Sequence, residues 1–322
     1  MVESSCVGQP LTFTSFPITR VAVGEVYRYE VKAVDATGHR VFISAPSIPP
    51  WLRFDTASAV LQGISSVPGQ YAVQLVVRQG SMRVTQNFMV TVCDAQTKNI
   101  LFLGNSITNG TDKYNSYRRP LWKLLREEQY NFDLVGSWDK HHSGGTVPDA
   151  DFDLDHEGHS GWTAHQMMHP PAWDSTRGNI HMWLQQYAPD IVLIELGTND
   201  VFQCRTAAEF TNDLREIITI LRSRRAAVKI IIVSVLPLGK KWASQNLCGT
   251  EPYGKLIRMM NDAIHKFAPL NTGKESPITV VDIDTGMDPD TDMYDGIHPN
   301  DKGEKILAAR FFPVIAQYLN KL

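Results

Sequence analysis

The feature that most constrains the fold of this chain is an alternation of apolar runs and amphipathic stretches that begins at Asn99. Runs such as "NILFLG", "DIVLIELG" and "VKIIIVSVLP" are rich in Val and Ile at successive positions, and helical patterns such as "AAEFTNDLREIITILRSRR" separate them. Strands that are apolar on both faces are typical of a parallel sheet covered by helices on each side. The sequence therefore predicts a doubly wound, flavodoxin-like α/β/α sandwich over residues 95–322.

The preceding residues, 1–94, have the rhythm of antiparallel strands. In "QYAVQLVVRQ" the side chains of Tyr71, Val73, Leu75 and Val77 share one face, and "QNFMVTV" alternates in the same way. No long helical period interrupts them. We expect a small all-β sandwich, and a chain of 322 residues with 43% hydrophobic residues is long enough for two separate cores.

Composition excludes several classes of partner. The formal net charge is -3 and no block of like charge occurs, which predicts no nucleic-acid partner. No apolar run approaches the roughly 20 residues that cross a bilayer, so no membrane span is expected. The start, "MVESSCVGQP", lacks the basic and apolar regions of a signal peptide. The chain is either cytoplasmic or a mature secreted form with an added Met.

Four cysteines bear on that choice. None has the close spacing of a zinc site or a redox pair, and four cysteines permit three pairings. We favour the bridges Cys6 with Cys93 and Cys204 with Cys248, each within one predicted domain, which would place the protein in an oxidising, extracellular compartment. The alternative is four buried thiols.

Residues suited to nucleophilic catalysis follow the predicted strands. Ser106 comes directly after "NILFLGN", Asn199 follows "DIVLIELGT", and Asp295 precedes His298 by three residues near the chain end. In doubly wound sheets, ligands bind beyond the carboxyl ends of the strands. A serine nucleophile needs a base, a group that orients the base, and donors for the oxyanion. Each of these residues could instead cap a helix or a turn.

In four blocks the sequence resembles the SGNH hydrolases. The blocks are "GNSIT" with Ser106, "EGHSGW" with Gly158, "GTND" with Asn199, and "DGIHP" with Asp295 and His298. Their order and approximate spacing fit across residues 99–320. The first block departs from the usual Gly-Asp-Ser, because Asn105 stands where an aspartate is expected.

The resemblance implies a role for each of these residues. Ser106 would be the nucleophile, His298 its general base, and Asp295 the group that orients the imidazole. The backbone N–H groups of Ser106 and Gly158 and the side-chain amide of Asn199 would hold the oxyanion. This chemistry implies no cofactor and no metal.

Within the hydrolases, "DLVGS" followed by "DHEGHSGW" resembles the acetylxylan-esterase-type carbohydrate esterases. The segment from Trp138 to Trp162 carries few aliphatic residues, whereas a long acyl chain needs an apolar tunnel. An acetylated polysaccharide or oligosaccharide, such as acetylated xylan, is therefore the expected substrate. Trp162 is a candidate for stacking on a sugar ring, with burial as the alternative. A lipolytic esterase or thioesterase, and a noncatalytic carbohydrate-binding or adhesion protein, remain alternatives.

The first domain resembles the cadherin-like, dystroglycan-type repeat of secreted proteins. The resemblance covers most of residues 8–93 and rests on Trp51, Leu52, Phe54, Asp55, Leu61, Gly63, Pro68, Gly69 and Tyr71. A spacer or docking domain is the default expectation for it.

Two patterns resemble metal sites. "HQMMH" places His165 and His169 four apart, but Gln166 stands where a zinc protease has its glutamate base. In the acidic run "PDADFDLDHEGH", Leu154 stands where a calcium loop starting at Asp149 needs a glycine, which favours a solvated loop.

Overall fold

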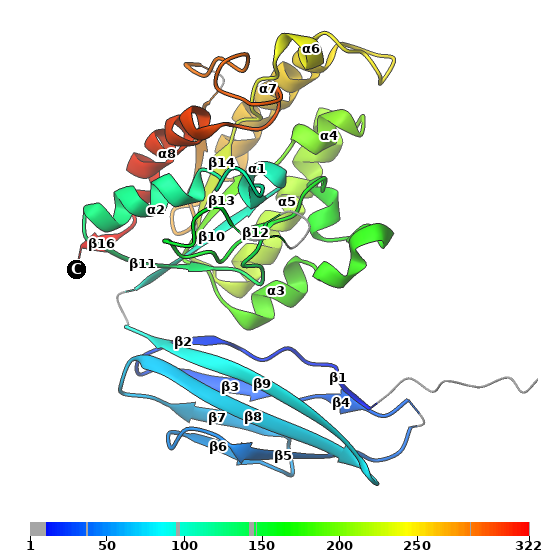
Figure 1. Ribbon diagram of the computed structural model, residues 1–322, viewed down its shortest axis with the longest axis vertical. Helices are drawn as coiled ribbons and strands as arrows, with labels where there is room; N and C mark the ends of the chain where they lie inside the picture. Colours follow the sequence, from blue (N-terminus) through cyan, green and yellow to red (C-terminus); the bar gives the residue numbers. More distant parts are fainter. Residues whose placement is uncertain are drawn as a thin grey trace, which may run out of the picture. The chain divides into compact units, whose positions relative to one another are not determined.

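The computed structural model describes residues 11–36, 38–94, 97–141, 145, 147–283 and 285–321. Over these residues the chain divides into two compact units (Figure 1). The first unit comprises residues up to Thr97 together with Gln185–Tyr187, and the second comprises Lys98–Leu184 and the residues from Ala188 onward.

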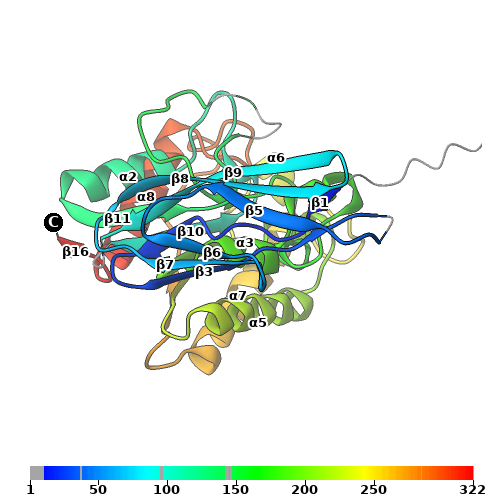
Figure 2. The same ribbon diagram turned by 90° about the horizontal axis from the view of Figure 1, so that it is seen from below.

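The first unit contains β-strands in two main sheets (Figure 2). The four-stranded sheet has the order β2 (Arg20–Ala22), β9 (Met82–Cys93), β8 (Gly69–Gln79) and β5 (Phe42–Ser47). The three-stranded sheet has the order β3 (Val26–Glu30), β7 (Val60–Ile64) and β6 (Leu52–Asp55), and β1 (Thr12–Phe13) pairs with β4 (Ala33–Val34).

Side chains from both sheets form the core of this unit. Val73, Leu75 and Val77 are buried on β8, as their alternation predicts. Val73 and Leu75 belong to the same core as Tyr27 and Tyr29 of β3. The predicted all-β, Ig-like sandwich is confirmed. One pairing differs from the antiparallel expectation, because β2 lies parallel to β9.

The second unit is built on one sheet. Its strands are β10 (Lys98–Gly104), β11 (Tyr130–Val135), β12 (Glu157–Gly158), β13 (Ile191–Glu195), β14 (Lys229–Val233), β15 (Ile278–Val281) and β16 (Asn320–Lys321). The order is β15-β14-β13-β10-β11-β16, with β12 also paired to β10, and only β16 is antiparallel to its neighbour. The five strands from β15 to β11 have the flavodoxin-like order, so the predicted fold class is confirmed.

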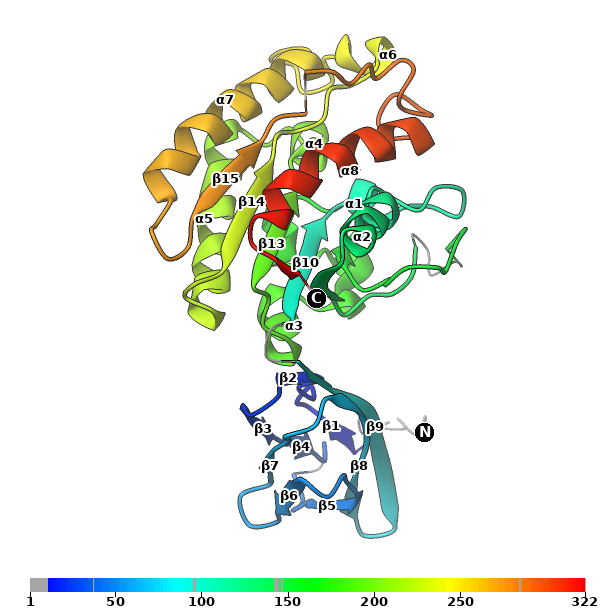
Figure 3. The same cartoon turned by 90° about the vertical axis from the view of Figure 1, so that its left-hand side faces the viewer.

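Helices cover both faces of this sheet (Figure 3). They are α1 (Ser106–Asn109), α2 (Arg118–Glu127), α3 (Ile180–Gln186), α4 (Thr198–Phe202), α5 (Ala207–Arg224), α6 (Lys240–Ala243), α7 (Tyr253–Asn271) and α8 (Asp301–Ala316), with the 3-10 segments η2 (His165–Met167) and η3 (Ala172–Arg177). α2 packs with α8 on one face, and α5 packs with α7 on the other. All five residues of β13 are buried, which explains their continuous apolar run.

Candidate active site

Ser106 lies at the carboxyl end of β10, at the start of α1. The side-chain oxygen of Asn105 accepts the backbone N–H of Ile107 at 2.8 Å and so caps this short helix. Gly104 precedes the cap, and a Cβ there would lie 2.8 Å from the carbonyl oxygen of Glu195. The close approach of β10 to β13 therefore requires glycine. The result is a half-buried hydroxyl at the edge of the sheet.

His298 and Asp295 reach this hydroxyl from the loop before α8. Nε2 of His298 lies 2.8 Å from Oγ of Ser106, and Nδ1 lies 2.7 Å from Oδ2 of Asp295. The carboxylate accepts a hydrogen bond from Nδ1–H, which leaves Nε2 unprotonated and able to accept a hydrogen bond from the serine hydroxyl. The predicted convergence of these three side chains is therefore present.

The charge of Asp295 is supported by several donors. Its Oδ1 accepts the backbone N–H of Ile297 at 2.9 Å and that of His298 at 2.7 Å. Partial burial raises the pKa of Asp295, but the hydrogen bonds from the side chain and backbone of His298 outweigh it and hold the pKa below its ordinary value. The carboxylate is thus ionised at neutral pH.

The loop that carries this pair has its own supports. The backbone N–H of Tyr294 donates to the carbonyl of His298 at 3.0 Å. The indole Nε1 of Trp242, in α6, donates to the carbonyl of Asp295 at 2.9 Å. Trp242 was not predicted from the sequence, and no local pattern points to it, because its partner lies 53 positions later.

Asn199 enters the site from the first turn of α4, directly after β13. Gly197 has φ +113°, and a Cβ there would also meet Val235 at 2.5 Å, so the turn between strand and helix requires glycine. The side-chain Nδ2 of Asn199 donates one hydrogen to the carbonyl of Trp162 at 2.9 Å. That bond fixes the amide and leaves its second hydrogen for another acceptor.

Gly158 does not supply an oxyanion donor in this structure, which corrects the sequence prediction. It lies buried in β12, paired with Gly104, and its N–H donates to Nδ1 of His156 at 2.7 Å. Nε2 of His156 lies 2.9 Å from the carbonyl of Lys140 and donates to it. Burial lowers the pKa of His156 well below its ordinary value, so the neutral ring keeps Nδ1 as an acceptor. The N–H of Gly158 is therefore already engaged.

The second glycine of the same block, Gly161, was missed. It has φ +83° and follows Ser160, whose Oγ accepts a hydrogen bond from Nδ2 of Asn109 in α1 at 2.9 Å. It precedes Trp162, whose carbonyl holds the amide of Asn199. Gly161 thus lies between the nucleophile helix and Asn199. The sequence did offer a hint of this second candidate, because the block "EGHSGW" contains two glycines.

Trp162 does not present its ring to a ligand, and the predicted stacking on a sugar is wrong. Its side chain is 0% exposed and stacks on His159 with ring centroids 4.5 Å apart. Trp183 also stacks on His159, with ring centroids 4.6 Å apart. The indole N–H of Trp162 donates to Asp174 at 3.1 Å. The alternative of burial holds, and only the backbone carbonyl of Trp162 serves the site.

A buried carboxyl lies beneath the nucleophile. Glu195, the last residue of β13, accepts hydrogen bonds from Nδ2 of Asn105 at 3.3 Å and from Oγ1 of Thr108 at 3.1 Å. Burial raises the pKa of Glu195 to about 8 and outweighs the hydrogen bonds from Thr108 and Asn105, which lower it. The amide of Asn105 therefore donates to a buried carboxyl that would repel an aspartate at this position once the carboxyl ionises.

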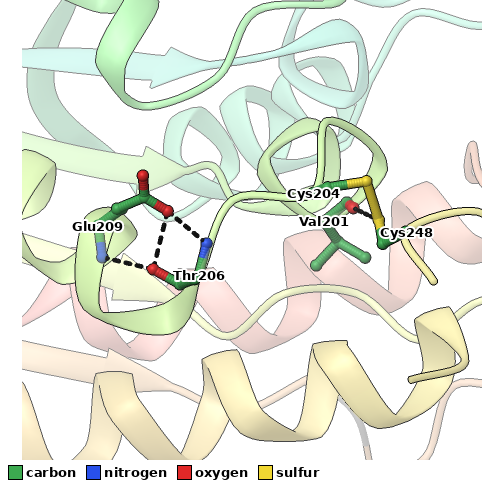
Figure 4. Close-up of a disulfide and its surroundings, with 5 residues drawn as sticks. All are labelled: Val201, Cys204, Thr206, Glu209 and Cys248. Carbon is green, nitrogen blue, oxygen red and sulfur yellow. Dashed lines mark hydrogen bonds between the residues drawn. A yellow bond between two sulfur atoms is a disulfide. The ribbon is translucent and has the colours of Figure 1, made fainter. Parts of the chain in front are cut away.

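The disulfide Cys204–Cys248 joins the segment after α4 to the loop after α6 (Figure 4). The predicted pair is confirmed. In the same view, Thr206 and Glu209 form a reciprocal capping box at the start of α5. The other predicted pair, Cys6 with Cys93, involves Cys6, which lies outside the described residues, so it stays a prediction.

Metal and membrane features can be reported for the described ranges only. There, no group of three or more His, Cys, Asp or Glu side chains is placed to hold a metal ion. His165 instead lies 3.2 Å from Asp213, through Nδ1 and Oδ1. None of the helices that these ranges contain combines the length and apolar character needed to cross a membrane.

A flavodoxin-like sheet with a serine at its carboxyl edge that contacts a histidine, which in turn contacts an aspartate, is typical of carboxylic ester hydrolases. Comparison with known families makes the assignment specific. The chain belongs to the GDSL-like Lipase/Acylhydrolase family, whose family model matches residues 102–306. Residues 9–93 match the He_PIG family of Ig domains. The resemblance to SGNH hydrolases is therefore confirmed.

Curated relatives include the Multidomain esterase of Ruminococcus flavefaciens, which is 29% identical over 238 residues, 70% of this chain and 29% of the relative. The Acetylxylan esterase of Xylanibacter ruminicola is 32% identical over 135 residues, 38% of this chain and 28% of the relative. The chain thus spans less than a third of the length of either protein.

Similar solved structures include a carbohydrate esterase family 3 protein from Talaromyces cellulolyticus, with 30% identity and a TM-score of 0.55. The family 3 carbohydrate esterase of Clostridium thermocellum has 25% identity and a TM-score of 0.54. Each comparison covers 69% of this chain and 97% of the other.

Proposed function

We propose that the protein removes short acyl groups, principally acetyl, from a carbohydrate such as acetylated xylan or a related polysaccharide. The observation that carries the proposal is the continuous contact from Ser106 through His298 to Asp295, with hydrogen-bonding atoms 2.8 and 2.7 Å apart. The similarity to carbohydrate esterases of family 3 and to an acetylxylan esterase supports the substrate class.

The proposed mechanism has two steps. Nε2 of His298 takes the hydroxyl proton as Oγ of Ser106 attacks the acetyl carbonyl carbon. The bond from that carbon to the sugar oxygen breaks, and the imidazolium returns its proton to the departing sugar hydroxyl. A water molecule, deprotonated by His298, then attacks the acyl-enzyme, which releases acetate and restores Ser106. Asp295 stabilises the imidazolium in both steps.

The tetrahedral intermediates need donors for their oxyanion. We assign the backbone N–H groups of Ser106 and Gly161 and the second amide hydrogen of Asn199 to this role. Gly161 replaces Gly158 in this assignment, because the Gly158 N–H is bound to His156. Asn199 is held for the task by the carbonyl of Trp162.

Acetate release from acetylated xylan and other acetylated glycans tests the proposal. Ser106→Ala should abolish turnover, and Asn199→Ala should reduce the rate roughly 100- to 1,000-fold. Full activity in Ser106→Ala would overturn the mechanism. Rates on acetyl, butyryl and octanoyl esters test the acyl group, and preference for octanoyl would favour a lipolytic esterase instead.

The cysteines support a location for this activity. A disulfide such as Cys204–Cys248 persists in oxidising surroundings and supports an extracellular location.

A further inference from the structure

We propose that Trp173 is a platform for a sugar ring of the substrate, beside the active site on its Gly161 side. The inference rests on the proposed function and deepens it, because it names a residue that binds the carbohydrate chain rather than the acyl group. Trp173 lies in η3 and is 66% exposed, the most exposed aromatic side chain among the described residues.

The position of Trp173 links it to the reacting groups. A Cβ built on Gly161 would lie 3.5 Å from Cη2 and 3.9 Å from Cζ2 of the Trp173 indole, so the six-membered ring borders this glycine. Gly161 is the residue between Ser160, which contacts Asn109 of the nucleophile helix, and Trp162, which holds Asn199. A ligand bound through its acyl group near Gly161 would therefore extend past Trp173.

The segment below the indole is anchored. The carboxylate of Asp174 accepts the indole N–H of the buried Trp162 at 3.1 Å and Nε of Arg177 at 3.2 Å. The guanidinium of Arg177 lies 3.5 Å from the ring centroid of Trp138. Asp174 and Arg177 are thus half-buried and hold the segment, while the ring of Trp173 is largely exposed. A platform held in place before binding loses little entropy when a ligand arrives.

The surroundings of Trp173 favour a sugar ring over a lipid chain. The residues that follow Trp173 in η3 are polar, and Ser175 and Thr176 are exposed, so the ring is a flat surface bordered by polar side chains. An acyl chain needs an enclosed apolar pocket, whereas a sugar offers one apolar face and a rim of hydroxyl groups. An aromatic ring bordered by polar groups matches the second kind of ligand.

A second exposed aromatic residue of this unit, Tyr294, is less suited to the role. Tyr294 is 42% exposed, but its ring stacks with Tyr114 at 4.7 Å and with His298 at 5.7 Å between centroids. Trp173 has no such ring contact among the described residues. Its aromatic surface is therefore the one that a ligand could cover.

Kinetics on two substrates test the platform. In Trp173→Ala, the ratio of kcat/KM on acetylated xylo-oligosaccharides to kcat/KM on 4-nitrophenyl acetate should fall about 10-fold, which corresponds to roughly 1.4 kcal/mol. The fall should appear mainly in KM for the oligosaccharide. Trp173→Tyr should retain most of the ratio, because an aromatic face remains. Leu270→Ala is the matched control, since Leu270 is 84% exposed in α7, and its ratio should equal that of the wild type.

The outcomes separate the platform from the proposed function. An unchanged ratio in folded Trp173→Ala, or an equal loss on both substrates, would overturn the platform. A wild-type protein that releases no acetate from any acetylated glycan would instead refute the proposed function. Calorimetric binding of unacetylated xylo-oligosaccharides to Ser106→Ala, with and without Trp173→Ala, measures the platform without turnover. Binding should weaken about 10-fold, and equal affinities in the two proteins would count against the platform.

Discussion

Asn105 shows how a departure from a family pattern can be explained by one neighbour. The pattern has an aspartate before the nucleophile, but here the side chain at this position faces the buried carboxyl of Glu195, 3.3 Å away. An amide can donate to that carboxyl and still cap α1 through its oxygen. The residue beside Ser106 is thus selected by the end of β13, which lies 90 positions away in the chain.

Replacing this amide by a second carboxyl should destabilise the protein in a pH-dependent way. We expect Asn105→Asp to lower the free energy of unfolding by about 1–3 kcal/mol at pH 8.5, because a donor is lost and two buried carboxylates then repel each other. The loss should be smaller at pH 6, where Glu195 is protonated and can donate a hydrogen bond. Urea denaturation at both pH values measures this.

Glu195→Gln supplies the control for that experiment. In the double variant Asn105→Asp/Glu195→Gln, the added carboxylate faces an amide again, so most of the stability lost at pH 8.5 should return. If the single and double variants lose the same stability, Glu195 is not the cause.

Site residues could be predicted from the sequence where the type of side chain and its place after a strand indicate the role. They could not be predicted where the role depends on contacts with residues elsewhere in the fold. Ser106, Asn199 and His298 each follow a strand of a parallel sheet, and such strands end at one edge, so their convergence could be expected. The choice between Gly158 and Gly161 depends on which N–H is already bonded, and only the contact with His156 decides it. Likewise, the sequence "SGWT" does not show that the ring of Trp162 turns inward.

At the scale of elements, the disulfide stabilises the segment that presents Asn199. Cys204 lies two residues after the end of α4, and its partner Cys248 belongs to the loop that follows α6. Trp242, within α6, contacts the carbonyl of Asp295. Cys248 Sγ also lies 3.6 Å from the carbonyl of Val201 within α4. One covalent bond therefore connects the supports of Asn199 and Asp295.

Removing this bond should reduce both stability and activity. The two cysteines are separated by 44 positions, and closing a loop of that length lowers the entropy of the unfolded chain by an amount worth about 4 kcal/mol. We expect Cys204→Ser/Cys248→Ser to lose up to that free energy of unfolding and to have a lower kcat on 4-nitrophenyl acetate. Thr206→Ala is the control, because it removes only the cap of α5 and should lower the free energy of unfolding by about 1 kcal/mol without changing kcat. An unchanged kcat would show that α4 is held without the disulfide.

Long, periodic elements were predictable for the same physical reason that makes them stable. α5 and α7 bury one apolar face each, and β13 and β14 are buried on both faces, so their patterns are strong. β2 is three residues long, too short for its pattern to show that it pairs in parallel with β9. α6 has four residues and no buried side chain, so its sequence carries no helical period.

At the scale of the whole molecule, each unit has its own core. One interior includes Tyr27, Leu61 and Leu75, and the other includes Phe102, Leu193 and further residues of the second unit alone. A chain of residues 98–322 should therefore fold and hydrolyse 4-nitrophenyl acetate with the kcat/KM of the full chain. Activity assays with a circular dichroism spectrum check this. An insoluble or unfolded fragment would show that the Ig-like unit supports folding.

The second unit also buries several ionisable groups, which links its stability to pH. Burial raises the pKa of Glu195 to about 8 and those of Asp200 and Glu304 to about 7. Above the ordinary carboxyl pKa, the folded state therefore holds protons that the unfolded chain has lost. Burial lowers the pKa of His156 and of His141, which has the opposite effect on stability. That opposing effect ends near pH 7, because unfolded histidine is neutral above its ordinary pKa of about 6.5.

Above pH 7, the buried carboxyls still change the free energy of unfolding with pH, whereas the buried histidines no longer do. The free energy of unfolding should therefore fall as pH rises. For Glu195, a folded pKa of about 8 corresponds to a loss of about 1 kcal/mol in the free energy of unfolding between pH 7 and 8. Urea denaturation at constant ionic strength measures the slope. Glu195→Gln has no proton to lose at this position, so its stability should decline less over the same interval. A slope equal to that of the wild type would show that Glu195 is already ionised in the folded protein at pH 7, in spite of its burial between Asn105 and Thr108.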